Sequence, residues 1–357
     1  MALHPTGEAG PYPAEVRHRI RRDTQADYGY VARALNDCGV EVVCVQYGQG
    51  IWGGEDGSYV LDFARALRVP MVTTFHDVPA RPTPALWAIL TELVDRSAAT
   101  IVMSQSAAAE MTRSYGVAAD RLQIVPHGVP HLPQVAADTI KPRLGLQGRS
   151  VILSFGLLEP GKGCEAVIDA MPAVVAAIPN ATYVILGATD PNRLALDGNE
   201  YRAGLEAQVA ARGMGQYVRF VDRFVGRVEL GNWLEAADVI TTPYSSLDQT
   251  VSSTLSFAMA AGKPIVSTPY AYAIEMLSPD CGRLVPAGSS EALAREFIEL
   301  LSDPELRGAL GMRAYERSRG MVWWEVGSQY RHIFDGVIET AAAAPRPQFR
   351  NLAAVGA

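Results

Sequence analysis

Short runs of apolar, mostly β-branched residues alternate with longer amphipathic segments along most of the 357-residue chain. The runs are continuously apolar, as in strands buried on both faces, and the longer segments repeat their apolar residues with the period of a helix. This alternation predicts an α/β fold with parallel sheets and crossover helices. The expected strands are Val40–Tyr47, Pro70–Phe75, Ala99–Ser104, Leu122–Pro126, Ser150–Phe155, Ala181–Gly187, Tyr217–Val221, Ala237–Tyr244 and Lys263–Thr268.

A Pro-rich and weakly periodic stretch, residues 130–149, interrupts the alternation, which restarts at Ser150. The chain is also longer than one hydrophobic core usually holds. We therefore expect two Rossmann-like domains facing each other across a cleft, the first over residues 1–140 and the second over 146–323. An amphipathic helix is expected over residues 324–341, and a disordered tail over 342–357.

The opening segment, residues 1–26, is rich in Pro and Arg and shows neither the apolar run of a strand nor the period of a helix. An α/β domain of this type usually opens with a central strand. We therefore expect the first domain to lack its opening strand, which leaves Val40–Tyr47 without one neighbour. Because an exposed strand edge invites association, a homodimer is a further expectation.

Charge and hydropathy exclude some classes of partner. The net charge is −7, with 13 basic against 15 acidic residues up to Gly145 and 18 against 23 beyond it. Neither half has the basic excess that a phosphate backbone requires, so we expect no nucleic acid partner. No apolar run approaches the roughly 18 residues of a membrane span. A short basic run allows at most peripheral contact with anionic lipid, and a solvated surface explains it better; it comprises Arg17, Arg19, Arg21 and Arg22.

The cysteines are scattered without metal-binding or disulfide-framework spacing, at Cys38, Cys44, Cys164 and Cys281. This pattern fits a reducing compartment and predicts no metal site. The first residues contain no apolar segment of the kind found in secretory signals. A cytoplasmic location is the expectation.

Candidate chemistry lies where strands end, because ligands of open α/β sheets bind outside the carboxyl ends of the strands. The segment GLLEPGKG, Gly156–Gly163, follows one such strand. Its glycines allow the backbone to approach an anion, and Lys162 offers a positive charge for phosphate. A glycine-rich turn with an exposed lysine explains the segment equally well.

A second cluster follows the strand Ala237–Tyr244, where Ser252, Ser253 or Thr254 can cap a helix. The free amides and positive dipole end of that helix would then point toward the cleft, as a diphosphate requires. Ser and Thr are common caps in any helix. The functional interpretation therefore depends on Lys162 lying nearby.

In the first half, Gly53, Gly54 and Glu55 open a helical stretch directly after a strand. An acidic first turn suits the hydroxyls of a sugar acceptor, although stabilisation of the helix end explains it at least as well. His76 directly follows the next strand and is well placed for chemistry, whereas an isolated histidine is more often structural. His127, in VPHGV, either lines the cleft or turns the chain.

Several segments resemble one family of enzymes. SFGLLEPGKGCEAVIDAMP is similar to the G-R-L-x-x-x-K-G segment of family 4 glycosyltransferases, which have the GT-B fold, and ADVITTPYSSLDQTVSSTLSFAMAAGKPIVST resembles their donor-site signature. TTFHDV, VPHGV and MVWWEVGSQYRHIF match their T-x-H segment, their P-N-G-V turn and their closing helix. The resemblance runs from about Val40 to Gly336.

The resemblance implies transfer of a hexose, such as mannose or glucose, from a nucleotide-diphosphate sugar with retention of configuration and without a metal. The acceptor would be a carbohydrate or a lipid-linked sugar, and the closing helix would cross back onto the first domain. The implied donor site comprises Gly156, Lys162, Asp248, Val251, Ser252, Ser253, Thr254 and Glu275. His76 and Gln249 would act on the transferred sugar, and the implied acceptor side comprises Gly53, Gly54, Glu55 and His127.

The chain departs from the family pattern at three places. The paired glutamates of the signature fall on Gln249 and Phe257; the amide keeps hydrogen-bonding capacity for a sugar hydroxyl, but the phenyl ring cannot bind a ribose. We expect Asp248 or Glu275 to replace it. Leu157 stands where an arginine would donate twice to phosphate. The opening segment is the third departure. A bacterial subgroup with GIxGGExGS and TPYxYAxE shares the first two, which indicates a coherent variant.

Two other functions remain open from the sequence. A sugar phosphorylase on the same fold would bind inorganic phosphate at Lys162 and would not need a ribose contact at Phe257. A non-catalytic sugar-binding or partner subunit would fit the missing opening strand.

Overall fold

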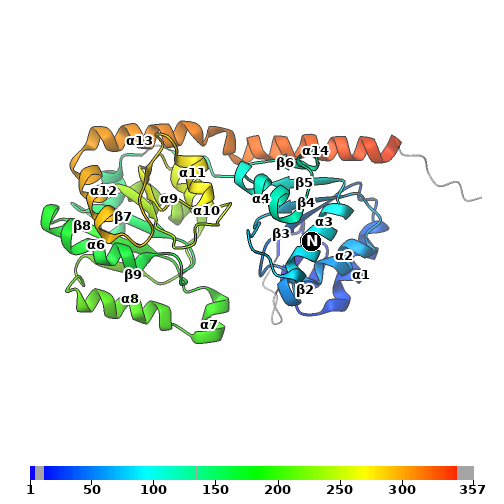
Figure 1. Cartoon of the computed structure of the whole chain (residues 1–357), viewed down its shortest axis with the longest axis horizontal. Helices are drawn as coiled ribbons and strands as arrows, with labels where there is room; N and C mark the ends of the chain where they lie inside the picture. The colour runs from blue at the N-terminus through cyan, green and yellow to red at the C-terminus, as the bar shows by residue number, and fades with distance from the viewer. Residues whose placement is uncertain (5–11, 134, 344–357) are drawn as a thin grey trace, which may run out of the picture.

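The computed structural model describes residues 1–4, 12–133 and 135–343, which form two α/β domains side by side (Figure 1). The first domain contains a four-stranded parallel sheet in the order β3-β4-β5-β6. Its strands are Val43–Tyr47 (β3), Met71–Phe75 (β4), Ala99–Val102 (β5) and Leu122–Ile124 (β6). Its helices are Gln25–Asn36 (α1), Val60–Ala66 (α2), Pro84–Arg96 (α3) and Gln105–Tyr115 (α4).

The second domain contains a six-stranded parallel sheet in the order β12-β11-β10-β7-β8-β9. Its strands are Ser150–Phe155 (β7), Ala181–Leu186 (β8), Val218–Val221 (β9), Val239–Thr242 (β10), Ile265–Ser267 (β11) and Arg283–Leu284 (β12). Its helices are Ala137–Ile140 (α5), Cys164–Ala177 (α6), Pro191–Asp197 (α7), Glu200–Ala211 (α8), Arg227–Ala236 (α9), Ser253–Ala260 (α10), Ala271–Leu277 (α11), Ser290–Ser302 (α12) and Pro304–Arg317 (α13).

The prediction of an α/β fold with parallel sheets is confirmed, and every expected strand lies within its expected bounds. The observed strands are mostly shorter because the apolar runs continue into buried turns. Val125, just past β6, is fully enclosed although it belongs to no strand. Apolar runs therefore locate strands better than they locate strand ends.

The prediction for the opening segment is wrong in part. Ala2–His4 (β1) and Arg19–Arg21 (β2) pair in parallel as a separate two-stranded sheet, and α1 begins at Gln25. Only Ile20 of β2 is buried, and a single apolar residue gives no visible run. β1 and β2 do not join the larger sheet, so β3 forms its edge, as expected.

A long C-terminal helix, Trp323–Ala343 (α14), lies along the first domain rather than the second (Figure 1). Its apolar face, including Val326 and Ile333, packs with Val72 and Ile101 of the first sheet. The expected disordered tail lies outside the described residues from 344 onward. The connections between the domains run side by side, since the Val129 carbonyl accepts a hydrogen bond from the Trp323 amide at 3.0 Å.

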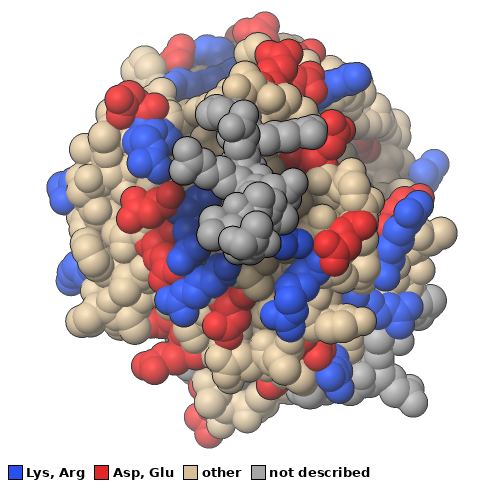
Figure 2. Space-filling view, turned by 90° about the vertical axis from the view of Figure 1, so that its right-hand side faces the viewer, with Lys and Arg blue, Asp and Glu red and all other residues tan. Residues whose placement is uncertain are grey.

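The outer end of the first domain carries basic and acidic side chains intermixed rather than in regions of one sign (Figure 2). In the basic run, Arg21 is paired with Asp27, with 2.8 Å between its guanidinium and the carboxylate. None of the described helices is long and apolar enough to span a bilayer.

Candidate functional site

The glycine-rich loop after β7 folds against the end of β10. Gly163, which directly precedes α6, has a φ of +71°, and a Cβ on it would lie 1.8 Å from the Pro243 carbonyl oxygen. Gly161 accepts a backbone hydrogen bond from the Ser245 amide at 3.0 Å. A side chain at Gly163 would therefore force the loop away from β10. This close approach places Lys162 beside the strand end.

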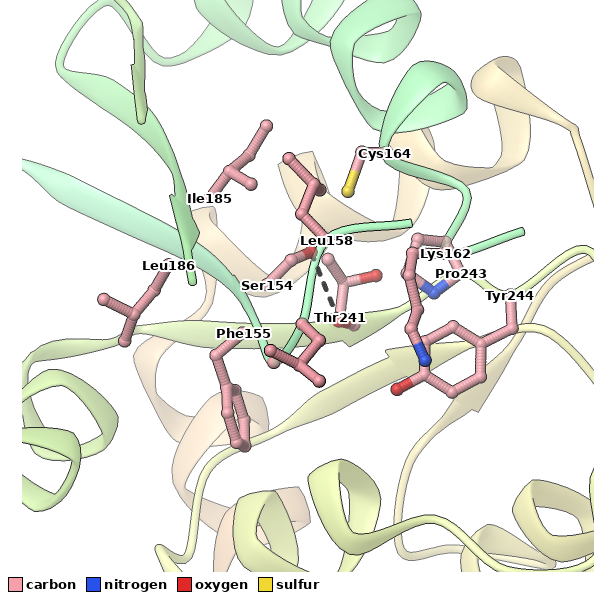
Figure 3. A pocket seen from close by; sticks show the side chains of 12 residues that line it. Ser154, Phe155, Leu158, Lys162, Cys164, Ile185, Leu186, Thr241, Pro243 and Tyr244 are labelled. Atoms are coloured by element: carbon pink, nitrogen blue, oxygen red, sulfur yellow. Dashed lines mark hydrogen bonds between the residues drawn. The ribbon is translucent and has the colours of Figure 1, made fainter. Parts of the chain in front are cut away.

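Lys162, in this loop, lies over the aromatic ring of Tyr244, which follows β10 (Figure 3). Its ammonium is 4.8 Å from the centre of the Tyr244 ring and 3.2 Å from a carboxylate oxygen of Glu159. Burial lowers the pKa of Lys162, but Tyr244 and Glu159 raise it by more, so that the net pKa lies above its ordinary value. Lys162 is therefore a permanent cation that a phosphate group can approach.

The N-terminus of α10 lies next to the same loop. Ser252 caps this helix, and its hydroxyl accepts a hydrogen bond from the Leu255 amide at 3.1 Å. The hydroxyl of Thr254 lies 3.5 Å from the place of a Cβ on Gly156. The amides of Ser253 and Thr254 are in the first turn, where a helix offers no carbonyl partner. The structure thus brings Gly156 to the positive end of α10.

Two adjoining cavities share Phe155, Gly156 and Leu157 as walls. One has a volume of about 20 Å³ and contains Lys162 and Tyr244 in its lining. The other, of about 110 Å³, is mainly apolar and is closed by residues 186–188 and 223–225 together with Leu230. The glycine at position 156 therefore separates a charged pocket from an apolar one.

A groove of about 370 Å³ lies between the domains. Its lining consists of Gln49 and residues 77–81 from the first domain, and Ser246 and residues 248–251 from the second. Arg81 and Asp248 bridge it, with 3.0 Å between guanidinium and carboxylate. Both side chains are exposed, so the pair is weak and can open to admit a ligand.

Gln249, the first of the two replaced glutamates, turns its amide nitrogen to the Val251 carbonyl at 2.8 Å. This contact fixes the side chain at the rim of the groove and leaves the amide oxygen free to accept another hydrogen bond. Gln249, expected at the transferred sugar, and Val251, expected in the donor site, both line this groove.

Two histidines stand where the domains meet. His76 directly follows β4, and its Nε2 lies 2.7 Å from Oε1 of Gln46. The Nδ1 of His127 lies 2.9 Å from the Gly128 carbonyl, and its ring packs edge-on against Phe257 at 6.1 Å between centroids. Burial lowers the pKa of both histidines, and His76 also lowers that of His127. Both are therefore neutral at pH 7.

Phe257, in place of the second glutamate, belongs to an apolar seam between the domains. It packs with Val129, Ala260 and Val322, which are buried at the crossing of the two connections. A carboxylate here would have to leave water without gaining a cation among these neighbours. The phenylalanine therefore stabilises the contact between the domains.

The hypothesis that Glu275 binds a ribose requires a free carboxylate in the donor site. The Glu275 carboxylate is not free. Glu275 lies near the end of α11, not at its start, and its two carboxylate oxygens accept hydrogen bonds from the backbone amides of Gln105 and Ser106 at 2.9 and 2.8 Å. These amides belong to the first turn of α4, in the other domain. Both carboxylate oxygens are thus engaged between the domains, which leaves Asp248 of the two candidates; it lines the groove together with Asp77.

The expected acceptor residues Gly53, Gly54 and Glu55 do not line the groove. Gly53 is buried; its amide donates to the Tyr28 hydroxyl at 2.9 Å, and a Cβ on it would lie 1.9 Å from the Arg22 carbonyl oxygen. The absence of a side chain at Gly53 allows its backbone to lie close to Arg22, just before α1. Gly54 and Glu55 are exposed in a short 3-10 turn, Glu55–Gly57, instead of in the expected helix.

Sequence reasoning missed several residues that line these cavities, namely Arg81, Arg223, Phe224 and Tyr244. Tyr244 ends a predicted strand, so its position at a carboxyl end was a usable signal. The other three lie in irregular segments without periodicity. Among the described residues, no three His, Cys, Asp or Glu side chains gather as metal ligands would, and the four cysteines are free thiols.

Comparisons with known proteins agree over both domains. A family model described as Glycosyl transferases group 1 matches residues 137–317, and one described as Glycosyltransferase Family 4 matches residues 6–131. A phosphatidyl-myo-inositol mannosyltransferase of Mycolicibacterium smegmatis is 26% identical over 80% of this chain and 71% of its own. A D-inositol 3-phosphate glycosyltransferase of Jonesia denitrificans is 25% identical over 75% of this chain and 66% of its own.

Solved structures show the same architecture. Anabaena HepE, solved in complex with UDP and glucose, superposes with a TM-score of 0.74 at 17% identity, over 89% of this chain and 86% of its own. Sucrose-phosphate synthase from Thermosynechococcus elongatus gives a TM-score of 0.72 at 22% identity, over 87% and 78%. These likenesses establish the GT-B fold of the chain.

Proposed function

Because the chain belongs to the glycosyl transferases group 1 family, we propose that it moves a hexose, with retention of configuration, from a nucleotide-diphosphate sugar to a carbohydrate or lipid-linked acceptor. The curated relatives are named as mannosyltransferases and inositol-phosphate glycosyltransferases, which favours mannose or glucose as the hexose. In this reaction the bond from the sugar to the diphosphate breaks, and an acceptor oxygen takes its place on the same face of the sugar.

The observation that carries the proposal is the convergence of the Gly156–Gly163 loop with the N-terminus of α10. Lys162 supplies a full positive charge, and the amides of Ser253 and Thr254 supply partial charges beside Gly156. A departing diphosphate develops negative charge, and preorganised donors of this kind stabilise it most strongly. Since these groups supply the positive charge, the proposed transfer needs no metal ion.

The nucleoside is assigned to the apolar cavity on the other side of Gly156. Leu157 and Phe224 offer apolar surface to a base. The cavity touches the phosphate pocket, so one nucleotide can span both. Leu157 therefore has a use here that the arginine expected at its position would not have.

The transferred sugar and the acceptor are assigned to the cleft in front of this site. Gln249 is a neutral hydrogen-bonding group in its lining, where Asp248 and Arg81 lie across the groove, and the neutral His76 directly precedes Asp77 of the same lining. A neutral imidazole can accept a hydrogen bond from a sugar hydroxyl without a charge that would attract the diphosphate away from Lys162. Opening of the Arg81–Asp248 pair would free both groups for an acceptor.

A sugar phosphorylase is the second candidate, and the apolar setting of Phe257 favours it. This residue has no hydrogen-bonding atom for a ribose, and Lys162 offers inorganic phosphate a positive charge. In that reaction phosphate would break a glycosidic bond and become attached to the released sugar. A non-catalytic sugar-binding subunit is the third possibility.

A thermal-shift screen with nucleotides, nucleotide sugars, and inorganic phosphate with sugars separates these functions. A ligand at 100 times its Kd stabilises the folded protein by about 2.7 kcal/mol, which is well resolved in melting temperature. We expect UDP or GDP, or their sugars, to raise the melting temperature. Stabilisation only by phosphate together with a sugar would replace the proposal with the phosphorylase, and stabilisation by sugars alone would indicate the binding subunit.

A further inference from the structure

A chain of hydrogen bonds joins the C-terminal helix to His76. The hydroxyl of Tyr330, on α14, lies 2.9 Å from the hydroxyl of Thr74, on β4. The amide nitrogen of Gln46, on β3, donates to this Thr74 hydroxyl at 3.3 Å and to the sulfur of Cys44 at 3.1 Å. The amide oxygen of Gln46 faces Nε2 of His76 at 2.7 Å.

The register of the sheet produces this alignment. Gln46 is the partner of Thr74 across β3 and β4, and side chains two residues apart in a strand share a face. Cys44 and Gln46 therefore lie beside Thr74 and His76, on the face that α14 covers with Tyr330. Tyr330 and Thr74 are 256 residues apart in the sequence, so only the folded chain brings their hydroxyls together.

The amide orientation determines which nitrogen of His76 carries the proton. In this orientation the amide nitrogen of Gln46 donates to Thr74 and Cys44, and its oxygen faces Nε2 of His76 as the acceptor. An acceptor at 2.7 Å requires a proton on Nε2, which leaves Nδ1 of the neutral ring with a free lone pair. Burial keeps this ring neutral by lowering the pKa of His76, against the opposing effect of Asp77.

From this geometry we infer that Gln46 is a positioning residue, which holds His76 in the Nε2–H tautomer and presents Nδ1 as the hydrogen-bond acceptor for a donor-sugar hydroxyl. Tyr330 supports it through Thr74, so docking of the C-terminal helix is coupled to the state of the histidine. The inference rests on the proposed function for its sugar partner, but the tautomer itself exists without any ligand.

The direct test is NMR of the full-length protein labelled with ¹⁵N at histidine, with the His76 signals assigned from a His76→Gln variant. We expect the long-range ¹H–¹⁵N pattern of the Nε2–H tautomer in the wild type. Gln46→Leu should turn it into a mixture of both tautomers, and Tyr330→Phe should weaken it, whereas Gln46→Glu should keep the proton on Nε2 but raise the pKa of His76, because a carboxylate stabilises the imidazolium. Gln123→Leu, at an exposed position of β6, is the matched control.

Transfer kinetics provide a second readout. Gln46→Leu should lower kcat by about tenfold, the scale of one hydrogen bond, with donor KM within about twofold of wild type. Gln46→Glu should recover the loss only above the raised pKa of His76, because Nδ1 of the imidazolium carries a proton and cannot accept. If Gln46→Leu does not fold, the NMR pattern of His76 in Gln46→Glu and in Tyr330→Phe still tests the inference.

The outcomes for the inference and for the proposed function are separate. An Nδ1–H tautomer in the wild type, or a tautomer unaffected by Gln46→Leu, overturns the inference even if the protein transfers sugar. Absence of transfer from every nucleotide sugar overturns the proposed function, whereas the NMR result still decides the tautomer.

Discussion

The carboxylate of Glu275 accepts a hydrogen bond from the backbone amide of Ser106 at 2.8 Å, and so joins α11 of the second domain to α4 of the first. The Gln105 amide donates to the other carboxylate oxygen, and the Ser104 hydroxyl donates to the Thr250 carbonyl at 2.7 Å across the same boundary. A negative charge at a helix N-terminus is favourable in itself. Glu275 therefore stabilises the contact between the two domains.

Replacing Glu275 should loosen this contact without removing a ligand to the donor. Glu275→Gln keeps one acceptor oxygen and loses the charge, so the folded protein should be less stable by about 1 kcal/mol, the scale of a charged helix-end contact. Thermal unfolding of the variant measures this loss, with Glu305→Gln, at an exposed first-turn position of α13, as the control. Unchanged stability together with a raised donor KM would instead place Glu275 on the nucleotide.

Lys162 should matter for transfer far more than for folding. Lys162→Ala should lower kcat/KM by an amount equivalent to about 2–3 kcal/mol, because one charged donor to the diphosphate is lost. Glu159→Gln is the matched control, since it removes the ion-pair partner of Lys162 and keeps the ammonium. Steady-state kinetics decide this prediction, and an unchanged kcat/KM for Lys162→Ala would remove the residue from the mechanism.

The apolar cavity beside Gly156 predicts that Phe224 contacts the nucleoside. This side chain is 81% exposed in the free protein, so Phe224→Ala should hardly affect stability. If a base packs on the ring, the variant should bind UDP or GDP about tenfold more weakly. Calorimetric titration measures this, with Val228→Ala as the control, because Val228 is 83% exposed and lies outside the cavity. Equal losses in both variants would contradict the assignment.

Lys263 lies on the side of the second domain away from the candidate site. Its environment predicts that the stability of the protein depends on pH. Its ammonium donates to the Glu235 carbonyl at 2.7 Å, and burial lowers its pKa to about 8. The unfolded chain keeps the higher ordinary pKa and therefore binds more protons above about pH 8, so the contribution of Lys263 to stability rises with pH in that range.

Urea unfolding between about pH 8 and pH 9.5 measures this slope below the titration of ordinary tyrosines, which would act in the opposite direction. The Lys263→Met variant, which cannot titrate, should show a flatter profile than the wild type. Parallel profiles for the two proteins would show that Lys263 is protonated in the folded state throughout.

The strands were predictable from the sequence because their signal is local. Runs such as Ser150–Phe155 are continuously apolar, and both faces of the sheet are covered. β1 and β2 gave no such signal, since each has three residues and their pairing joins Ala2 to Arg19, which are far apart in the sequence. The boundary of a short strand depends on its partner, which sequence patterns do not reveal.

The candidate site was predictable where one loop or one helix end forms it. Lys162 and Ser252 are such cases, because a glycine-rich loop and a helix cap each have a local pattern. The role of Glu275 was not predictable, because its partners are backbone amides 169 and 170 residues away in the other domain. Phe257 looked like a lost ribose contact, whereas its neighbours show that it fills the seam between the domains.

The most direct test of the account is to measure release of nucleoside diphosphate from a panel of UDP- and GDP-hexoses, with sugar and lipid-linked acceptors, by the wild type and Lys162→Ala. The account predicts acceptor-dependent release by the wild type from at least one donor, a glycoside product with the anomeric configuration of that donor, and a loss with Lys162→Ala of about 30- to 160-fold. No release from any donor, together with formation of a sugar phosphate from inorganic phosphate and a glycoside, would contradict it and establish the phosphorylase.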